Sequence, residues 1–292
     1  MKVAYSAAYE VLLPGHVWPT SKYRLIAERL AGRAVTFVEP SEASWDDLAL
    51  VHTPEYLDKI RNDTLSADEI ATLELPWVPA LTSGFRRMVA GSCLAAAAAL
   101  EDGVAAHLGG GLHHAFANHG EGFCPFNDVA IAIRVLQRAQ IRRAAIVDCD
   151  VHHGNGTAMI FERDRTVFTL SIHQQHNYPL FKPRSDLDVG LQDGARDDEY
   201  LAALRGALPP VLAHAPELVV YLAGADPFEK DRLGGLELTK KGLAERDRLV
   251  IDAARRAGVP LVTVLAGGYA ADVNDTVDIH LATIEAMIGS SV

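Results

Sequence analysis

Cysteine is scarce in this sequence, and long apolar runs and a surplus of positive charge are absent. The 292 residues include three cysteines, Cys93, Cys124 and Cys149, whose odd number and spacing match neither a disulfide framework nor a zinc knuckle. A reducing, cytoplasmic environment is the simplest expectation. The longest apolar run, Leu94–Leu100, is too short to span a bilayer. The N-terminus shows no basic segment followed by a long apolar run, so no signal peptide is expected either.

The balance of charge disfavours some partners and favours others. Lysine and arginine number 27 against 38 aspartates and glutamates, which gives a formal net charge of −11. A field of that sign repels phosphate backbones, so we expect no nucleic-acid binding, whereas a basic peptide or a polyamine would be attracted. Hydrophobic residues make up 49% and charged residues 22%, which is typical of a folded globular protein.

Short apolar runs alternate with longer amphipathic segments along the chain. The expected strands are Lys2–Tyr5, Val104–Leu108, Ala144–Asp148, Val167–Ile172, Leu218–Leu222 and Leu261–Leu265. The expected helices are Lys22–Leu30, Pro54–Arg61, Arg86–Glu101, Asn127–Ala139, Asp197–His214, Lys240–Ala257 and Asp275–Ile288. This alternation predicts an α/β fold with a doubly wound, mostly parallel sheet flanked by helices. Because no repeat or linker divides the sequence, residues 1–292 are interpreted as one domain.

Polar residues follow five of the expected strands, at the point where each strand ends. They are His113 and His114, the run from Asp148 through Asp150 to His152, and then His173, Asp226 and Tyr269. In doubly wound sheets, ligands bind beyond the carboxyl ends of the strands. The sequence therefore predicts that these side chains converge on one site.

The run VDCDVHHGNG, residues 147–156, has the residue types of a metal site. Alternate side chains of an extended chain share a face, so Asp148, Asp150 and His152 should point the same way. Asp226 is placed to supply a further ligand from another strand. Asp150, His152 and Asp226 would leave a zinc ion with an open position, as catalysis requires. Such a run alone fits a solvated loop equally well, but the paired histidines and glycine-rich turns nearby favour a metal.

The segment GGGLHHA, residues 109–115, places His113 and His114 side by side after three glycines. A glycine-rich loop allows both rings to turn inward, and two adjacent histidines there favour proton transfer. Asp148 is available to hold one ring, and Asn155 the other. A carboxylate raises the pKa of a histidine and an amide does not, so the ring beside Asn155 should be the better base.

The segment LAGGYA, residues 265–270, places Tyr269 after two glycines at a strand end. A phenol there could donate a hydrogen bond to a substrate carbonyl oxygen opposite the metal. For an isolated tyrosine, packing against the turn would be the commoner role.

Taken in order, these motifs resemble the zinc-dependent histone deacetylase superfamily over essentially the whole chain. The matching segments are GGGLHHA, GEGFCPFND (residues 120–128), VDCDVHHGNG, SIHQQHNYP (residues 171–179), RSDLDVGLQDG (residues 184–194), GADP and GGY. The pattern is most similar to class IV enzymes and their bacterial relatives. The resemblance implies the arginase–deacetylase fold, which agrees with the predicted sheet.

The resemblance also implies roles for individual residues. In the catalytic centre, the resemblance implies that Asp150, His152 and Asp226 bind zinc. It implies that His113 and His114 transfer protons, with His114 as the general base, and that Asp148 supports His113. It also implies that Tyr269 polarises the substrate carbonyl. The roles in the acyl-lysine tunnel are walls formed by Phe123 and Tyr178, with Leu233 at its mouth. Those of a potassium site, partly through backbone carbonyls, are Asp148, Asp150, His152, Ser171 and Ile172.

Three departures from the family pattern stand out. Asn155 replaces an aspartate of class I enzymes, as in class II and class IV members. Ala266 stands where a third glycine is common, which would shift Tyr269 slightly. The loop from His16 to Tyr23 lacks the insertion that narrows the entrance of polyamine deacetylases, which makes a polyamine substrate less favoured.

These observations predict a zinc-dependent amidohydrolase that removes acetyl or longer acyl groups from lysine side chains or related amines. An acetylpolyamine or small-amide deacetylase and a non-catalytic, zinc-bearing ligand sensor remain alternatives. A two-metal manganese ureohydrolase is disfavoured, because His113 and His114 stand where its second metal needs other ligands. The sequence leaves open the acyl chain length, a monomeric or dimeric state, and whether Cys124 is oxidisable or only a buried packing thiol.

Overall fold

A computed structural model describes residues 1–11 and 13–289 of the chain. Residue 12 and residues 290–292, which the predicted domain includes, lie outside the described residues. The described part contains one eight-stranded sheet with the strand order β2-β1-β3-β8-β7-β4-β5-β6. Every strand pairing in it is parallel. The predicted α/β sheet is therefore confirmed, and it is parallel throughout rather than mostly so.

The six predicted strands are all present, with ends that differ by up to two residues. The strands are β1 (Lys2–Ala4), β2 (Thr36–Val38), β3 (Val104–His107), β4 (Ala144–Asp148), β5 (Val167–Gln174), β6 (Leu187–Leu191), β7 (Leu218–Leu222) and β8 (Leu261–Val264). β4 and β7 lie at the centre and are buried along their whole length, which explains their nearly continuous apolar sequences.

The seven predicted helices are also present, and α5 is six residues longer at its start than predicted, because it begins at Ala80 instead of Arg86. The helices are η1 (Ala7–Tyr9), α1 (Ser21–Leu30), α2 (Trp45–Leu48), α3 (Pro54–Asn62), α4 (Ala67–Leu73), α5 (Ala80–Asp102), α6 (Asp128–Gln137), α7 (Asn155–Phe161), α8 (Asp197–Ala213), α9 (Lys240–Ala257) and α10 (Val273–Ile288). Gly258 ends α9 in the left-handed conformation, as its place before Pro260 predicts.

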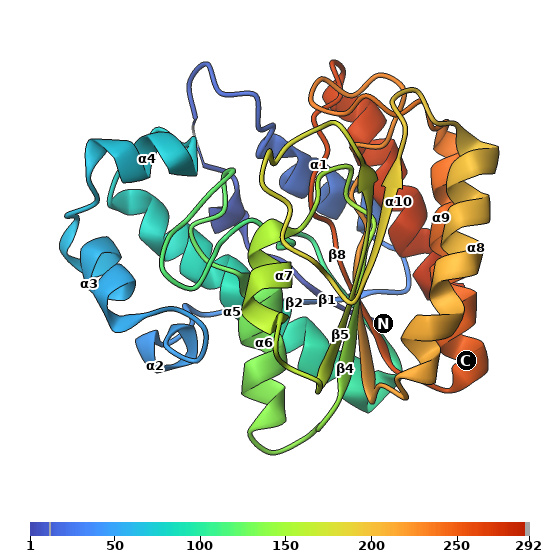
Figure 1. The fold of residues 1–292 in the computed structure, drawn as a ribbon, viewed down its shortest axis with the longest axis horizontal. Coiled ribbons are helices and arrows are strands. Elements are labelled where there is room, and N and C mark those ends of the chain that lie inside the picture. The colour runs from blue at the N-terminus through green and yellow to red at the C-terminus, as the bar shows by residue number, and fades with distance from the viewer. Residues whose placement is uncertain (12, 290–292) are drawn as a thin grey trace.

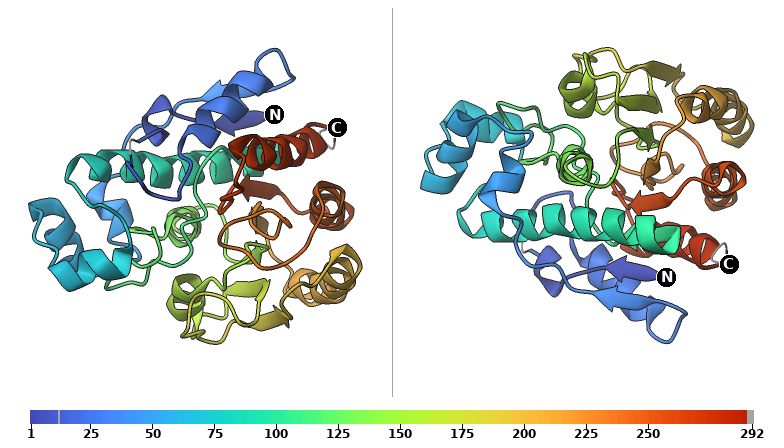
Figure 2. Two further views of the ribbon diagram at one scale, coloured as in Figure 1. Left: turned by 90° about the horizontal axis from the view of Figure 1, so that it is seen from above. Right: turned by 90° about the horizontal axis from the view of Figure 1, so that it is seen from below.

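Helices cover both faces of the sheet. Figure 1 shows α8, α9 and α10 on one side of the strands and α5, α6 and α7 on the other. α1 packs beside α10, so it completes the first layer. Figure 2 shows the short helices α2, α3 and α4, in light blue, at the far end of α5 from the C-terminal helices. They enclose a third apolar cluster, which includes Tyr56, Trp77 and Phe126.

The sequence did not predict β2, β6 and the short helices α2, α4 and α7. β2 has three residues and is largely exposed, and β6 alternates between half-buried and exposed positions. Both lie at the edges of the sheet and pair with only one neighbouring strand. Their side chains are only partly buried, so their sequences lack the apolar pattern that marks a strand. The missed helices have seven residues or fewer, too short for a clear helical period.

The strand order creates the place for a site. From β4 the chain passes outward to β5 and β6, whereas from β7 it passes in the other direction to β8. Crossovers that leave neighbouring strands in opposite directions open a crevice at the carboxyl ends of those strands. Within the described residues, the helices are all too short or too polar to form a membrane span.

The buried leucines of the α8 layer should dominate the stability of this fold. Leu204 on α8 is 0% exposed and Leu94 on α5 is 40% exposed. We expect Leu204→Ala to lower the free energy of unfolding by about 2–5 kcal/mol, because it leaves a cavity. Leu94→Ala should change it by no more than about 0.5 kcal/mol. Urea denaturation of both variants tests this, and equal effects would contradict the described packing.

Candidate active site and metal centre

The carboxyl ends of β3, β4, β7 and β8 bring the predicted site residues together. The loop after β4 carries Asp150 and His152, and the segment after β7 carries Asp226. Cys149 and Val151 point away from the site into the apolar core, as the alternation predicted. All three predicted zinc ligands are buried.

Asp150, His152 and Asp226 form a group whose ligand atoms all lie within 4.8 Å of one another. His152 Nδ1 lies 2.9 Å from Asp150 Oδ1 and 3.3 Å from Asp226 Oδ2. Asp226 Oδ1 accepts a hydrogen bond from the backbone N–H of Val151, but Oδ2 has no hydrogen-bond partner among the described residues. Burying a carboxylate oxygen that has an ion contact with His152 but no hydrogen bond is costly, and a metal cation would satisfy it. One imidazole and two carboxylates are a donor set that fits zinc.

The charges of this group depend on one another. Burial and the neighbouring Asp150 raise the pKa of Asp226 to about 7. Burial favours a neutral His152, but its contacts with the two carboxylates raise its pKa to about 10. Without a metal, a proton therefore partly offsets the buried negative charge. A divalent cation would take over that role and would bind the deprotonated imidazole.

The backbone beside Asp150 and Asp226 passes so close to their carboxylates that position 267 has no room for a side chain. The N–H of Gly267 donates to Asp150 Oδ2 at 2.8 Å. A Cβ atom on Gly267 would collide with Asp226 Oδ2 and Asp150 Oδ2.

Arg246, fully buried on α9, donates to the carbonyl oxygens of Gly224 and Cys149 and so ties the loops after β7 and β4 together.

His113 and His114 lie side by side at the site, with ring centroids 4.1 Å apart. Their loop is not helical, so both rings reach inward as the glycine-rich sequence predicted. His113 Nδ1 lies 2.7 Å from Asp148 Oδ2, and His114 Nδ1 lies 2.8 Å from Asn155 Oδ1. The structure therefore assigns Asp148 to His113 and Asn155 to His114, a pairing that reasoning from the residues alone left open.

The two partners give the two rings different proton affinities. Burial opposes the charged form of His113, but the charges of Asp148 and Asp150 raise its pKa to about 9. Burial and the neighbouring charges of His113 and His152 hold the pKa of His114 well below its usual value. At neutral pH, His113 is the proton-bearing ring and His114 is the neutral one.

Tyr269 follows β8 and lines both cavities of the site. Its backbone N–H donates to Asp231 Oδ2 at 2.6 Å, which holds the turn. Ala266 adopts a positive φ of 53°, the conformation for which the glycine common at this position is suited. Burial and the charges of Asp150 and Asp226 raise the pKa of Tyr269 well above its usual value, so its hydroxyl keeps the proton that it would donate.

A cavity of about 270 Å³ leads to these residues. The predicted tunnel residues Phe123, Tyr178 and Leu233 all line it, together with Glu74. The ring of Tyr178 packs edge-on against His114 with centroids 5.0 Å apart. A second, smaller cavity of about 30 Å³ is lined by Asp150, His152 and Tyr269 on the site side and also by Cys124 and Trp18.

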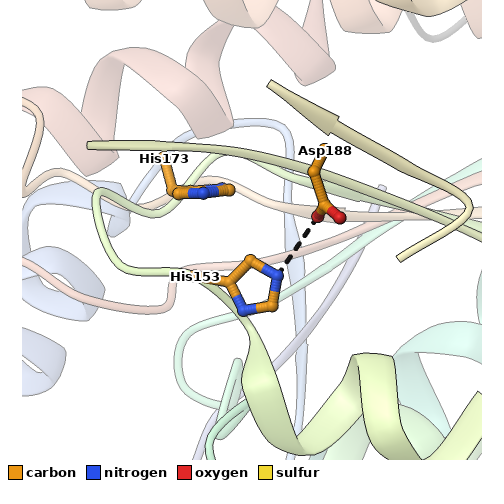
Figure 3. A group of neighbouring side chains, drawn as sticks. All are labelled: His153, His173 and Asp188. Carbon is orange, nitrogen blue, oxygen red and sulfur yellow. Dashed lines mark hydrogen bonds and ion pairs between the residues drawn. The ribbon is translucent and has the colours of Figure 1, made fainter. Parts of the chain in front are cut away.

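A second cluster of metal-ligand type comprises His153, His173 and Asp188. Figure 3 shows a hydrogen bond from His153 to Asp188, with Nε2 and Oδ1 3.1 Å apart, and the rings of His153 and His173 meet edge-on with centroids 4.7 Å apart. The other oxygen of Asp188 accepts the backbone N–H of Ser185, and His173 Nδ1 contacts Ser171 Oγ. Both carboxylate oxygens of Asp188 already have hydrogen bonds, whereas Oδ2 of Asp226 has none among the described residues. The cluster ties the loop after His152 to β6.

The residues of the predicted potassium site lie at the adjoining ends of β4 and β5. Asp148 and Ser171 are cross-strand partners, and Ile172 follows on β5. Asp148 Oδ1 accepts the backbone N–H of Asp150. The structure thus brings this set together, and its role in binding potassium stays a prediction.

Three further residues contribute to the site and were given no role by the sequence. Glu121 contacts Asn155, Asp231 holds the turn at Tyr269, and Lys22 donates to the carbonyl oxygen of Ala266 at 2.9 Å. Burial lowers the pKa of Lys22 to about 8. The sequence does contain an indication of this role, because Lys22 lies on the same face of its helix as Ile26 and Leu30, where an apolar residue would be expected. Glu121 and Asp231 lie in loops that carry no such periodic signal.

The comparison with known protein families identifies this architecture. The histone deacetylase domain model matches residues 16–284. The chain belongs to the histone deacetylase family. Membership supports a hydrolytic deacetylase activity, and the predicted resemblance is confirmed.

Similar proteins come from several kingdoms. An uncharacterized protein of Picosynechococcus is 41% identical, with 95% of each chain covered. Histone deacetylase 2 of Arabidopsis thaliana is 33% identical, over 92% of this chain and 74% of that protein. A probable deacetylase of Methanothermobacter thermautotrophicus is 32% identical, over 92% of this chain and 86% of that protein.

The fold is also similar to a solved structure of this family. The crystal structure of the HDA15 HD domain superposes with a TM-score of 0.81 at 25% identity, over 99% of this chain and 91% of that one. The predicted arginase–deacetylase fold is confirmed by this similarity together with the single parallel sheet.

Asp226 Oδ2, which has no hydrogen bond among the described residues, provides an experimental way to distinguish the two metal-type clusters. We expect Asp226→Ala to lose bound zinc, because it removes a ligand that no neighbouring group replaces. Asp188→Asn should retain about one zinc per chain. Metal analysis of desalted, folded protein measures both. Full zinc content in the Asp226 variant, or loss of zinc in the Asp188 variant, would contradict the assigned centre.

Proposed function

We propose that this protein is a zinc-dependent deacylase that hydrolyses the amide of acylated lysine side chains or related amines. The observation that carries the proposal is the buried group of Asp150, His152 and Asp226 at the end of an aromatic cavity. One carboxylate oxygen of Asp226 has no hydrogen bond among the described residues, and Asp150 and His152 line a cavity together with His113 and His114, two histidines of unequal basicity. Family membership supports the same reaction class.

The zinc ligands would be Asp150, His152 and Asp226, and bound zinc would supply Lewis-acid activation of the acyl carbonyl and of water. His114, neutral and lining the cavity, accepts a proton from the attacking water. Tyr269 keeps its proton and donates a hydrogen bond to the carbonyl oxygen, so it stabilises the charge that develops there. His113, which is protonated at neutral pH, provides positive charge beside the site and a proton for the leaving amine.

The cavity suits a long apolar chain that ends in a polar group. Phe123, Tyr178 and Leu233 offer apolar wall surface, and Glu74 contributes a carboxylate to the lining. The net charge of −11 favours a cationic substrate molecule such as a lysine-rich peptide. Acetyl is the acyl group we assign first, because the smaller cavity lined by Asp150, His152 and Tyr269 has a volume of only about 30 Å³.

Two accessory properties complete the proposal. Asp148, Asp150, His152, Ser171 and Ile172 are assigned to a potassium ion that would brace the ends of β4 and β5. The three cysteines, all of which lie in the described residues, are unpaired, which fits a reducing cytoplasm. Burial raises the pKa of Cys124 well above its usual value, so its thiol is in the unreactive form and packing is its favoured role.

The substrate class is tested with a panel of acyl-lysine peptides from acetyl to long-chain, alongside acetylated polyamines. We expect chelator-sensitive hydrolysis that is fastest with acetyl-lysine. Hydrolysis confined to acetylpolyamines would transfer the assignment to that substrate class. Tight hydroxamate binding without turnover of any amide would favour a zinc-bearing sensor instead.

Tyr269 is tested by removing its hydroxyl alone. We expect Tyr269→Phe to lower kcat by about 10²–10³, because one oxyanion donor is lost. Zinc content should not change, since Tyr269 is not a ligand. Steady-state kinetics with the best acyl-lysine peptide measures the loss, and near-normal turnover would remove Tyr269 from the mechanism.

A further inference from the structure

We propose that Glu121 is a positioning residue of this site, whose carboxylate orients the amide of Asn155 and thereby fixes the tautomer of His114. The inference rests on the proposed function for the role of His114 as general base. Asn155 links the two groups directly. Its Oδ1 lies 2.8 Å from His114 Nδ1, and its Nδ2 donates to Glu121 Oε1 at 2.7 Å.

The carboxylate of Glu121 determines which end of the Asn155 amide faces His114. The two ends of an asparagine amide have nearly the same shape, so packing alone does not stop the amide from turning by half a rotation. An ionised carboxylate accepts hydrogen bonds and cannot donate. Asn155 must therefore turn its NH₂ group toward Glu121 and its oxygen toward His114.

The orientation of the amide then sets the proton on the histidine. Because Asn155 Oδ1 is an acceptor, His114 Nδ1 must carry the ring hydrogen of the neutral imidazole. The lone pair is left on Nε2, the nitrogen that is free to act as a base. If Asn155 turned over, its NH₂ group would face Nδ1 and would favour the other tautomer, in which Nε2 carries the hydrogen and cannot accept a proton.

Glu121 is itself held in place and kept ionised. Its backbone exchanges two hydrogen bonds with Cys124, of 3.2 and 2.9 Å. Tyr178 Oη donates to the same oxygen, Oε1, at 3.1 Å, and His119 Nε2 lies 3.5 Å from Oε2. Partial burial favours the neutral acid, but the contacts with His119, Asn155 and Tyr178 keep the pKa of Glu121 below its usual value.

The need for Glu121 follows from the residue type at position 155. A carboxylate there would accept through either oxygen and would need no orientation, as Asp148 does for His113. The amide of Asn155 keeps His114 free of a counter-charge, but it must be oriented by a further group. Glu121 thus makes an amide partner compatible with a single tautomer of the base.

The test compares Glu121→Leu, which removes the acceptor, with Glu121→Gln, whose Oε1 can still accept from Asn155. We expect Glu121→Leu to lower kcat on an acyl-lysine peptide by about 10- to 100-fold with a smaller change in KM. Glu121→Gln should restore most of the activity. Nitrogen-15 NMR of histidine-labelled, zinc-loaded protein should show His114 protonated at Nδ1 in the wild type and in Glu121→Gln, and a tautomer mixture in Glu121→Leu.

Two controls separate orientation from other effects. Tyr178→Phe removes the other hydrogen bond to Glu121 Oε1 and should leave the tautomer of His114 unchanged. In an Asn155→Asp background, adding Glu121→Leu should not lower kcat further, because a carboxylate needs no orienting partner.

Several results would overturn the proposal. They are an unchanged tautomer in Glu121→Leu, equal losses in the leucine and glutamine variants, or the same loss in the Asn155→Asp background. The NMR readout does not depend on turnover, so it tests Glu121 even if the wild type hydrolyses no acyl-lysine and the proposed function fails.

Discussion

The central constraint on this structure is a pair of buried carboxylates, Asp150 and Asp226, that face each other across His152. Burying two like charges is unfavourable unless positive charge lies beside them, and Asp226 Oδ2, which has an ion contact with His152 but no hydrogen bond, is where a metal cation would bind in the proposed function. The surrounding backbone is arranged to tolerate this group. Glycine at position 267 leaves space beside both carboxylates, and the guanidinium of Arg246 fixes the two loops from below. These loops follow β4 and β7, two adjacent strands of the sheet that are buried along their whole length.

The second organising feature is the difference between two adjacent histidines. His113 and His114 have the same side chain, the same loop and nearly the same burial, and only their partners differ. Asp148 gives His113 a counter-charge, whereas Asn155 gives His114 a neutral acceptor. One ring thereby holds a proton and the other can take one. The amide partner requires an additional group to orient it, and Glu121 lies where that group must be.

Much of this site could be predicted from the sequence, because its residues follow the ends of apolar strands. Parallel strands of a doubly wound sheet share one functional edge, so Asp150, His152 and Asp226 had to be neighbours once the strands were placed. The partners of His113 and His114 could not be assigned from the residues alone, because either ring could have turned toward Asp148. The role of Glu121 could not be predicted from the sequence for a related reason. It contacts the site through an irregular loop, and the position of a side chain in such a loop is set by tertiary contacts that leave no period in the sequence.

The proposed source of activity is one metal ion at the Asp150, His152 and Asp226 group. The most direct test removes metal from the purified protein, adds zinc back stepwise, and measures hydrolysis of an acetyl-lysine peptide at each step. We expect chelation to abolish activity, and activity to return in proportion to added zinc until it saturates at about one zinc per chain. Activity that survives complete metal removal, or that needs two zinc ions per chain, would contradict this proposal.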